Sequence, residues 1–260
     1  MNDSDHLILT QKFANKTALV TLNNPPLNLV TLDLCRELYE TLLALEDDPE
    51  VRVIVLTGSG QRAFCVGSDI KEFPQVWDDV IHKKLQQENL TFNQVELLSK
   101  PVIAAMEGNV LGGGCELSMA CDIRILSEAG RIGLPEIELG VFPGSGGIFR
   151  LARLVGPAKA VEMMYTGQIL CAEEALRLGL VNQVVPQGTA CTAALELAGR
   201  IAQKPFEAIR LIKRGVRELW QKTTQECFYP NLELSRTVFQ TPDCAEGVDA
   251  FLHKRKPQFQ

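Results

Sequence analysis

Membrane spans and metal ligands are the clearest absences from this sequence of 260 residues. No apolar run approaches the roughly 20 residues that a membrane-spanning helix needs. Histidine occurs only three times, and no group of His and Cys has the spacing of a zinc site, so we expect no metal. The eight cysteines include no C-x-x-C pair, and a chain of this length needs no disulfides to fold, so we expect reduced thiols.

An excess of positive charge is also missing. The chain carries 26 Lys and Arg against 32 Asp and Glu, which gives a net charge of -6. Proteins that bind nucleic acids or anionic membranes are usually basic, so we expect neither partner. The first 16 residues are polar and carry acids, unlike a signal peptide, and together with reduced thiols they predict a cytoplasmic location.

The motifs of several common enzyme classes are absent as well. The sequence has no G-x-x-x-x-G-K-[ST] phosphate loop and no G-x-G-x-x-G dinucleotide fingerprint after an expected strand. Ser145 lies between two glycines, but Pro143 and Gly147 break the G-x-S-x-G pattern of a nucleophilic serine. These absences disfavour nucleotide binding and serine hydrolysis.

What the sequence does contain is an alternation of apolar runs and helical stretches, with a hydrophobic content of 46%. Runs typical of strands cover residues 17–22, 51–58, 101–106 and 122–126. Helical spacing covers a stretch that begins at Thr31 or Asp33, then residues 70–98 and 115–120. Such alternation predicts an α/β domain with mostly parallel strands.

The C-terminal part of the chain has a different pattern. Residues 189–252 show helical spacing nearly throughout, with breaks expected at Pro205, Pro230 and Pro242. We therefore predict an α/β core over residues 1–188, which holds the site, and a helical C-terminal subdomain over residues 189–260. Much of that subdomain is amphipathic, so it is suited to cover the core or another subunit.

Three loops rich in glycine each follow an expected strand, and they span residues 65–69, 112–116 and 143–147. Glycine lets backbone N–H groups approach a ligand closely, and a helix N-terminus adds free donors and partial positive charge. Two such loops that face each other would form an oxyanion hole. Taken alone, each loop is also explained as a tight turn.

Two glutamates lie in apolar surroundings next to these loops. Glu116 begins a short helix of small and apolar residues, and Glu136 follows Pro135 in a second apolar stretch. A carboxyl group in apolar surroundings favours its neutral form, which suits proton transfer near neutral pH. The simpler explanations are an acid placed at a helix start for Glu116 and a solvated loop acid for Glu136.

Together, these motifs resemble the crotonase, or enoyl-CoA hydratase/isomerase, superfamily. The similarity runs in order along almost the whole chain, at residues 63–73, 100–105, 108, 112–117, 122–123, 134–136, 139–140, 143–147, 150–151, 172–175, 179–182, 251–252 and 254–257. The resemblance implies a right-handed spiral of strand-strand-helix turns, followed by C-terminal helices that build a homotrimer or homohexamer. It also implies an acyl-CoA substrate, with no cofactor besides the coenzyme A that the substrate carries.

The same resemblance assigns catalytic roles. Two backbone N–H groups polarise the thioester carbonyl in this family, and the matching residues are Ser68, where members often have alanine, and Gly113. Hydratases carry two glutamates, which Glu116 and Glu136 match. Many isomerases have aspartate at the position of Gly144, so the resemblance favours enoyl-CoA hydratase.

Residues for substrate binding follow from the resemblance too. The entrance for CoA and the acyl group would be lined by Ser68, Asp69, Ile70, Lys71 and Gly113. Leu27 and Asn28 would lie near the CoA adenine. Lys71 is equally explained as a solvated lysine at a helix start.

Some alternatives stay open at this level. Phe73, Trp77 and Phe142 are candidates for the wall of the acyl pocket, but each is also explained as a core residue. Enoyl-CoA isomerisation and hydroxyacyl-CoA dehydration are alternative reactions. A non-catalytic CoA-binding assembly module is a third reading, which the two retained glutamates disfavour.

Overall fold

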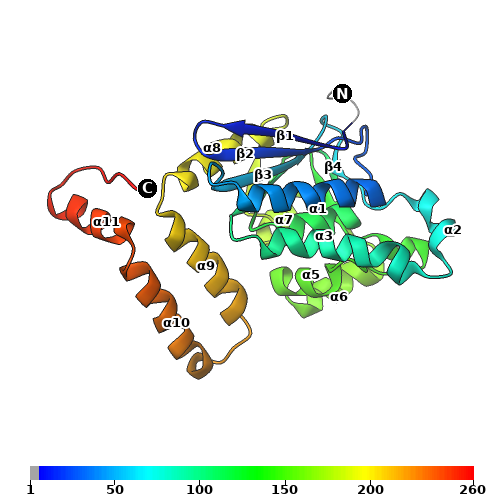
Figure 1. Ribbon diagram of the computed structural model, residues 1–260. Helices are drawn as coiled ribbons and strands as arrows, with labels where there is room; N and C mark the ends of the chain where they lie inside the picture. The colour runs from blue at the N-terminus through cyan, green and yellow to red at the C-terminus, as the bar shows by residue number, and fades with distance from the viewer. Residues whose placement is uncertain (1–5) are drawn as a thin grey trace.

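The computed structural model describes residues 6–260 and contains two β-sheets with helices packed around them (Figure 1). The larger sheet has the strand order β1-β2-β3-β5-β7-β10, and its neighbours are parallel except for β1 and β2. These strands are β1 (Ile8–Phe13), β2 (Thr17–Leu22), β3 (Val53–Gly58), β5 (Val102–Met106), β7 (Ile123–Ser127) and β10 (Gln183–Val185).

Helices cover both faces of the larger sheet, which explains why its central strands are apolar at nearly every position. On β3, Ile54 and Leu56 pack toward the cluster that includes the leucines of α1 (Leu32–Asp47). Val53 and Val55 point to the other face, toward the alanines of α8 (Ala190–Ala202). Thr31, one of the two helix starts that the sequence allowed, caps α1 by accepting a hydrogen bond from Leu34 N at 3.2 Å.

The smaller sheet follows the same progression along the chain as the parallel part of the larger one. It has the order β4-β6-β8-β9, with β4, β6 and β8 parallel and β9 antiparallel to β8. Its strands are β4 (Ala63–Cys65), β6 (Asn109–Leu111), β8 (Arg131–Gly133) and β9 (Ile169–Cys171). Each of β4, β6 and β8 follows one strand of the larger sheet, so the core is a spiral of strand-strand-helix turns.

Helices complete each turn of the spiral. After β4 come η2 (Ile70–Glu72), α2 (Phe73–Val76), η3 (Ile81–Leu85) and α3 (Gln86–Leu97). After β6 comes α4 (Gly113–Ala120), and after β8 come η4 (Glu136–Leu139), α5 (Gly147–Val155) and α6 (Pro157–Thr166). The short helix α7 (Ala172–Arg177) follows β9. The α/β class and the spiral expected from the sequence are confirmed.

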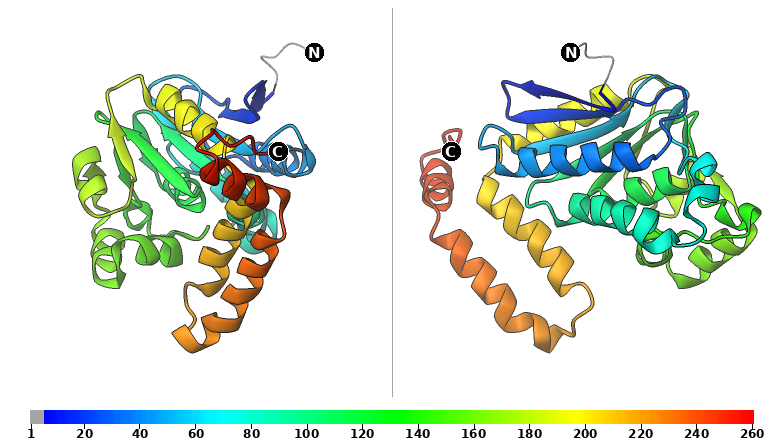
Figure 2. Two further views of the ribbon diagram at one scale, coloured as in Figure 1. Left: turned by 90° about the vertical axis from the view of Figure 1, so that its left-hand side faces the viewer. Right: turned by 45° about the vertical axis from the view of Figure 1, so that its right-hand side comes forward.

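Three further helices follow α8: α9 (Phe206–Leu219), α10 (Thr224–Phe239) and α11 (Pro242–Leu252). They extend away from the two sheets (Figure 2). Lys213 ties α9 to the core, because its ammonium group contacts Asp122 Oδ2 at 2.8 Å and Lys100 O at 3.0 Å. Although α8 falls in the expected C-terminal subdomain, it packs on the larger sheet, and the division at residue 188 stays a prediction.

The helix break expected at Pro230 is wrong. Pro205 and Pro242 do mark the starts of α9 and α11, whereas Pro230 lies inside α10. The chain turns earlier, where Thr223 and Glu226 form a capping box that begins α10. Proline removes one helical hydrogen bond, and here the helix continues without it.

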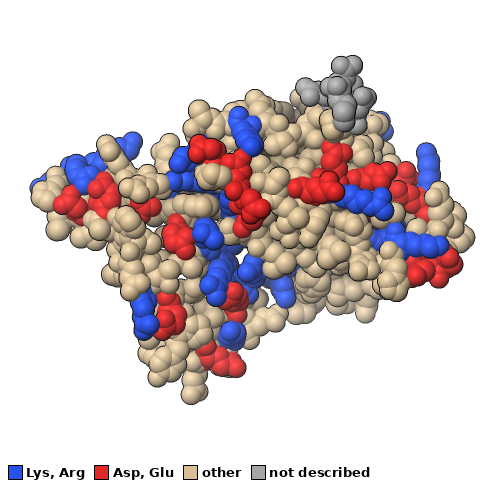
Figure 3. All heavy atoms as spheres, in the orientation of Figure 1, with Lys and Arg blue, Asp and Glu red and all other residues tan. Residues whose placement is uncertain are grey.

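No helix in the described part of the chain is long and apolar enough to cross a bilayer. On the face drawn in Figure 3, acidic and basic side chains lie among one another and do not form a large field of one sign.

Candidate active site

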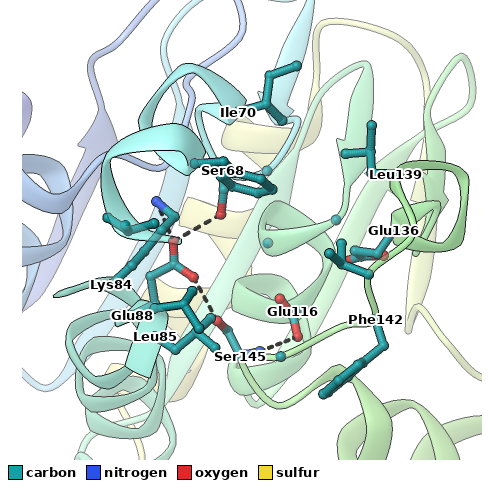
Figure 4. A pocket seen from close by; sticks show the side chains of 18 of the residues that line it. Ser68, Ile70, Lys84, Leu85, Glu88, Glu116, Glu136, Leu139, Phe142 and Ser145 are labelled. Atoms are coloured by element: carbon teal, nitrogen blue, oxygen red, sulfur yellow. Dashed lines mark hydrogen bonds and ion pairs between the residues drawn. The ribbon is translucent and has the colours of Figure 1, made fainter. Parts of the chain in front are cut away.

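A cavity of about 440 Å³ lies beside the smaller sheet, at the carboxyl ends of β4, β6 and β8. One wall comes from the loops that follow these strands, and it contains Ser68, Gly113 and Glu136. The opposite wall comes from α2, η3 and the start of α3 (Figure 4). Because parallel strands end at the same edge of a sheet, their loops meet at one place.

Two backbone N–H groups at this edge lack acceptors. The neighbouring N–H groups of Asp69 and Gly112 bond to Val30 O and Gly133 O, whereas Ser68 N and Gly113 N make no hydrogen bond within residues 6–260. A Cβ built on Gly113 would lie 3.6 Å from Ser68 N, so the two donors come from loops in contact. Gly113 is also the first residue of α4, where N–H groups have no helical partner.

Glu116 lies one turn into α4 and is 3% exposed. Its Oε1 accepts hydrogen bonds from Ser145 N and Gly147 N, both at 2.8 Å. Burial raises the pKa of Glu116 to about 8, against the lowering effect of these two donors and with a further increase from the charge of Glu136. The carboxyl group of Glu116 is therefore fixed in position, and its pKa lies close to neutral pH.

Glu136 begins η4 and is arranged differently. Both carboxyl oxygens are buried and have no hydrogen-bond partner in the described part of the chain, although the residue as a whole is half-buried. Burial raises its pKa to about 7. The carboxyl group faces the Gly112 turn, since a Cβ on Gly112 would lie 3.4 Å from Glu136 Oε1. A buried carboxyl group without a partner, on the wall of a cavity, is suited to act on a ligand.

The sequence model of the enoyl-CoA hydratase/isomerase family matches residues 12–260. This protein belongs to that family. The resemblance drawn from the motifs is thereby confirmed.

Similar proteins of known name extend this result. The chain is 40% identical over 242 residues to the short-chain-enoyl-CoA hydratase of Clostridium acetobutylicum, with 93% of each chain covered. It is 37% identical over 256 residues to the crotonyl-CoA hydratase of Syntrophomonas wolfei, with 98% of each covered. The crystal structure of an enoyl-CoA hydratase from Bacillus anthracis superimposes with a TM-score of 0.94 at 36% identity, covering 98% of this chain and 99% of the other.

The residues expected at the site of this family member fall into two groups. Ser68, Ile70, Gly113, Glu116 and Glu136 line the cavity together. The aromatic candidates Phe73, Trp77 and Phe142 line it too.

The other expected residues lie off the cavity wall. Asp69 accepts a hydrogen bond from Lys71 N at 3.0 Å and so caps η2, while the side chain of Lys71 is exposed. Asn28 is fully buried and donates hydrogen bonds to Ser59 O at 3.0 Å and Ala63 O at 2.9 Å. The Asn28 side chain thus holds its loop, and a contact of Leu27 or Asn28 with CoA stays a prediction.

Sequence reasoning missed one polar cluster in the wall. Lys84 and Glu88 are each 2% exposed and form an ion pair of 3.0 Å across one turn of helix. Residues four apart with opposite charge are the usual pattern of a solvated helix face, so nothing in the sequence marked them as buried.

No group of three or more His, Cys, Asp and Glu that could hold a metal ion occurs among residues 6–260.

Proposed function

We propose that this protein is an enoyl-CoA hydratase, which adds water across the C2=C3 double bond of a 2-enoyl-CoA thioester. One observation carries the proposal: two buried carboxyl groups, Glu116 and Glu136, line the same cavity as the two free donors Ser68 N and Gly113 N. An oxyanion hole with a pair of acid–base groups is what hydration of a thioester-activated alkene requires.

The thioester oxygen would lie between Ser68 N and Gly113 N. Negative charge develops on this oxygen as water adds at C3, and one positioned donor of this kind contributes about 3 kcal/mol in other enzymes. Glu116 would orient the water and take its proton, since its Oε1 is fixed by two N–H groups. Glu136 would supply the proton at C2, since its carboxyl oxygens lie at the cavity wall without a protein partner. We expect no cofactor beyond the CoA of the substrate.

The substrate class follows from the relatives and from the lining. Proteins named for short-chain and crotonyl substrates are among those most similar to this chain, so crotonyl-CoA is the first substrate to test. Leu85, Val141 and Phe142 give the cavity an apolar wall that suits an alkyl group. Gly144, at the position where many isomerases have aspartate, supports hydration over isomerisation.

A homotrimer or homohexamer is part of the proposal. Helix α10 has 16 residues and none of them is buried. The arm formed by α9, α10 and α11 exposes large apolar side chains: Ile212, Val216, Phe228, Tyr229, Leu232, Phe239 and Phe251. Apolar surface of this extent on an extended arm needs a cover, and other copies of the chain supply one. The cytoplasmic location stays a prediction.

The test is turnover of crotonyl-CoA by the purified protein, followed by the absorbance of the conjugated thioester and by the mass of the product. We expect a product heavier by one water, and no product from Glu136→Gln. The matched control is Glu138→Gln, which removes an exposed carboxylate from the same 3-10 turn and should leave turnover unchanged. A product of unchanged mass would indicate isomerisation, and CoA binding without turnover of any thioester would indicate a non-catalytic module.

A further inference from the structure

Glu88 connects two loops of the site through its two carboxylate oxygens. Ser68 Oγ donates a hydrogen bond to Glu88 Oε1 at 2.9 Å, and Ser145 Oγ donates one to Glu88 Oε2 at 2.8 Å. Figure 4 shows Glu88 between the two serines, with dashed lines to both. Ser68 belongs to the loop after β4, and Ser145 belongs to the loop before α5.

Both serines act in the site through their backbone. Ser68 N is one of the two free donors expected to bind the thioester oxygen, and Ser145 N donates to Glu116 Oε1 at 2.8 Å. The hydroxyl group of each residue therefore fixes the direction of a catalytically relevant N–H group. Glu88 holds both hydroxyl groups at once.

The Glu88 carboxylate is itself held in place. Lys84 Nζ lies 3.0 Å from Glu88 Oε1 and 2.7 Å from Glu72 Oε2. A carboxylate that is 2% exposed is costly unless it is paired and hydrogen-bonded, and here one ammonium and two hydroxyl groups compensate it. With three donors on its two oxygens, Glu88 has little capacity left to bind a substrate group.

We propose that Glu88 is a positioning residue that couples the oxyanion hole to the carboxyl group of Glu116, by fixing Ser68 and Ser145 together. This inference rests on the proposed hydratase function. Removal of either hydroxyl group leaves the Glu88 carboxylate with two of its three donors, so that it can shift and its bond to the other serine weakens. A change in one loop should therefore alter the geometry of the other.

Other contacts keep the two loops folded when this cluster is changed. Asn89 Nδ2 donates to Gly144 O at 3.0 Å, and Arg150 donates to Ser145 O at 3.1 Å. In the first loop, Val30 N donates to Gly67 O at 2.9 Å. A variant of Glu88, Ser68 or Ser145 should thus keep its backbone path and lose only the fine orientation of its N–H groups.

Glu88 also acts on Glu116 by its charge. The groups that face Glu116 are the carboxyl group of Glu136 on η4, the Glu88 carboxylate on α3, the buried Cys115 thiol on α4, and the N–H groups of Ser145 and Gly147. A nearby negative charge favours the neutral form of Glu116, so loss of the Glu88 charge should lower the pKa of Glu116. A residue with only a packing role would not move this pKa.

The first experiment is a double-mutant cycle on crotonyl-CoA hydration with Ser68→Ala, Ser145→Ala and the double variant. We expect each single variant to lower kcat about tenfold with KM within about twofold, because the interaction lost is one that acts on the transition state. The double variant should lose clearly less than the product of the two single losses. Independent, multiplicative losses would overturn the coupling, and so would a kcat unchanged in both single variants.

The second experiment is the pH profile of kcat/KM for Glu88→Gln, with Glu40→Gln as a control that removes an exposed carboxylate on α1. The part of the profile that reports the ionisation of Glu116 should move to lower pH in Glu88→Gln and stay in place in the control. An unmoved profile contradicts the electrostatic part of the proposal. If Glu88→Gln does not fold, the alanine variants decide, since they retain the pair of Lys84 and Glu88.

The third experiment needs no turnover, so it separates this proposal from the proposed function. The carbonyl stretching frequency of bound butyryl-CoA, a saturated thioester, reports polarisation by the oxyanion hole. Ser145→Ala lies in the other loop, and we expect it to reduce the frequency shift seen with the parent. An unchanged shift overturns the coupling even in an active enzyme, whereas a reduced shift supports it even where no enoyl-CoA is hydrated.

Discussion

The carboxyl group of Glu136 should make the folded protein less stable as the pH rises. Its pKa is about 7 in the folded protein, because burial disfavours its charged form, against a usual value of 4.5. Between these two values the folded state binds more protons at this site than the unfolded state does. The contribution of Glu136 to the free energy of unfolding is therefore complete below pH 4.5, where the group is neutral in both states. It is lost as the pH rises through 7, because the folded protein must then hold the charged form in a buried place.

The substitution that isolates this effect is Glu136→Gln, because the amide has nearly the same shape and does not ionise. The difference between a pKa of 7 and one of 4.5 corresponds to about 3 kcal/mol, which is an upper limit for a half-buried residue. The variant should equal the parent in stability near pH 4.5 and gain about 1.4 kcal/mol per pH unit above it. Above pH 7 the gain should stay constant.

Urea denaturation at several pH values between about 5 and about 8.5 measures the free energy of unfolding of both proteins. The protein concentration is kept the same throughout, because the stability of an oligomer depends on it. Glu138→Gln, which removes an exposed carboxylate, should show no such trend. A difference between Glu136→Gln and parent that does not vary with pH would refute the reasoning, since it would mean that Glu136 ionises freely in the folded state.

Three further predictions follow from the contacts described above. Glu116→Gln should lower kcat by about 10²-fold or more in the crotonyl-CoA assay, as expected for loss of a general acid–base group, while the circular dichroism spectrum stays unchanged. Asn28→Ala should lower the free energy of unfolding by about 1–3 kcal/mol in urea, because the buried Ala63 O and the half-buried Ser59 O lose their donor. Phe239→Asp should lower the mass of the assembly in sedimentation, since Phe239 is 77% exposed on α10; an unchanged mass would exclude this side chain from the interface.

Sequence reasoning succeeded where a local pattern is long or tied to a special residue. The leucines of α1 recur at helical spacing over 16 residues, and Thr31 supplies a recognisable cap. The strands β4, β6 and β8 have three residues each, which is too short for any periodicity to identify them. These strands determine which loops meet. The sequence therefore identified the glycine-rich loops of the site, but not the strands that bring them together.

The site residues show the same division. Glu136 was predicted because its neighbours Ile132 and Leu134 are apolar, and both are indeed fully buried. Lys84 and Glu88 have the spacing of a solvated ion pair, and only the packing of η3 and α3 against the core makes them buried. Burial of a charged pair depends on tertiary contacts, which no local pattern contains.

The division of the cavity between two kinds of wall has a consequence for how enzymes of this design change their substrates. The carboxyl pair and the free N–H groups follow the ends of β4, β6 and β8, whereas Phe73, Val76 and Trp77 lie in α2 and directly after it. We therefore expect that replacement of these three residues can change the acyl group that the site accepts without moving the reacting groups. Such a replacement should end before Lys84, because Lys84 pairs with Glu88, and Glu88 accepts hydrogen bonds from Ser68 and Ser145.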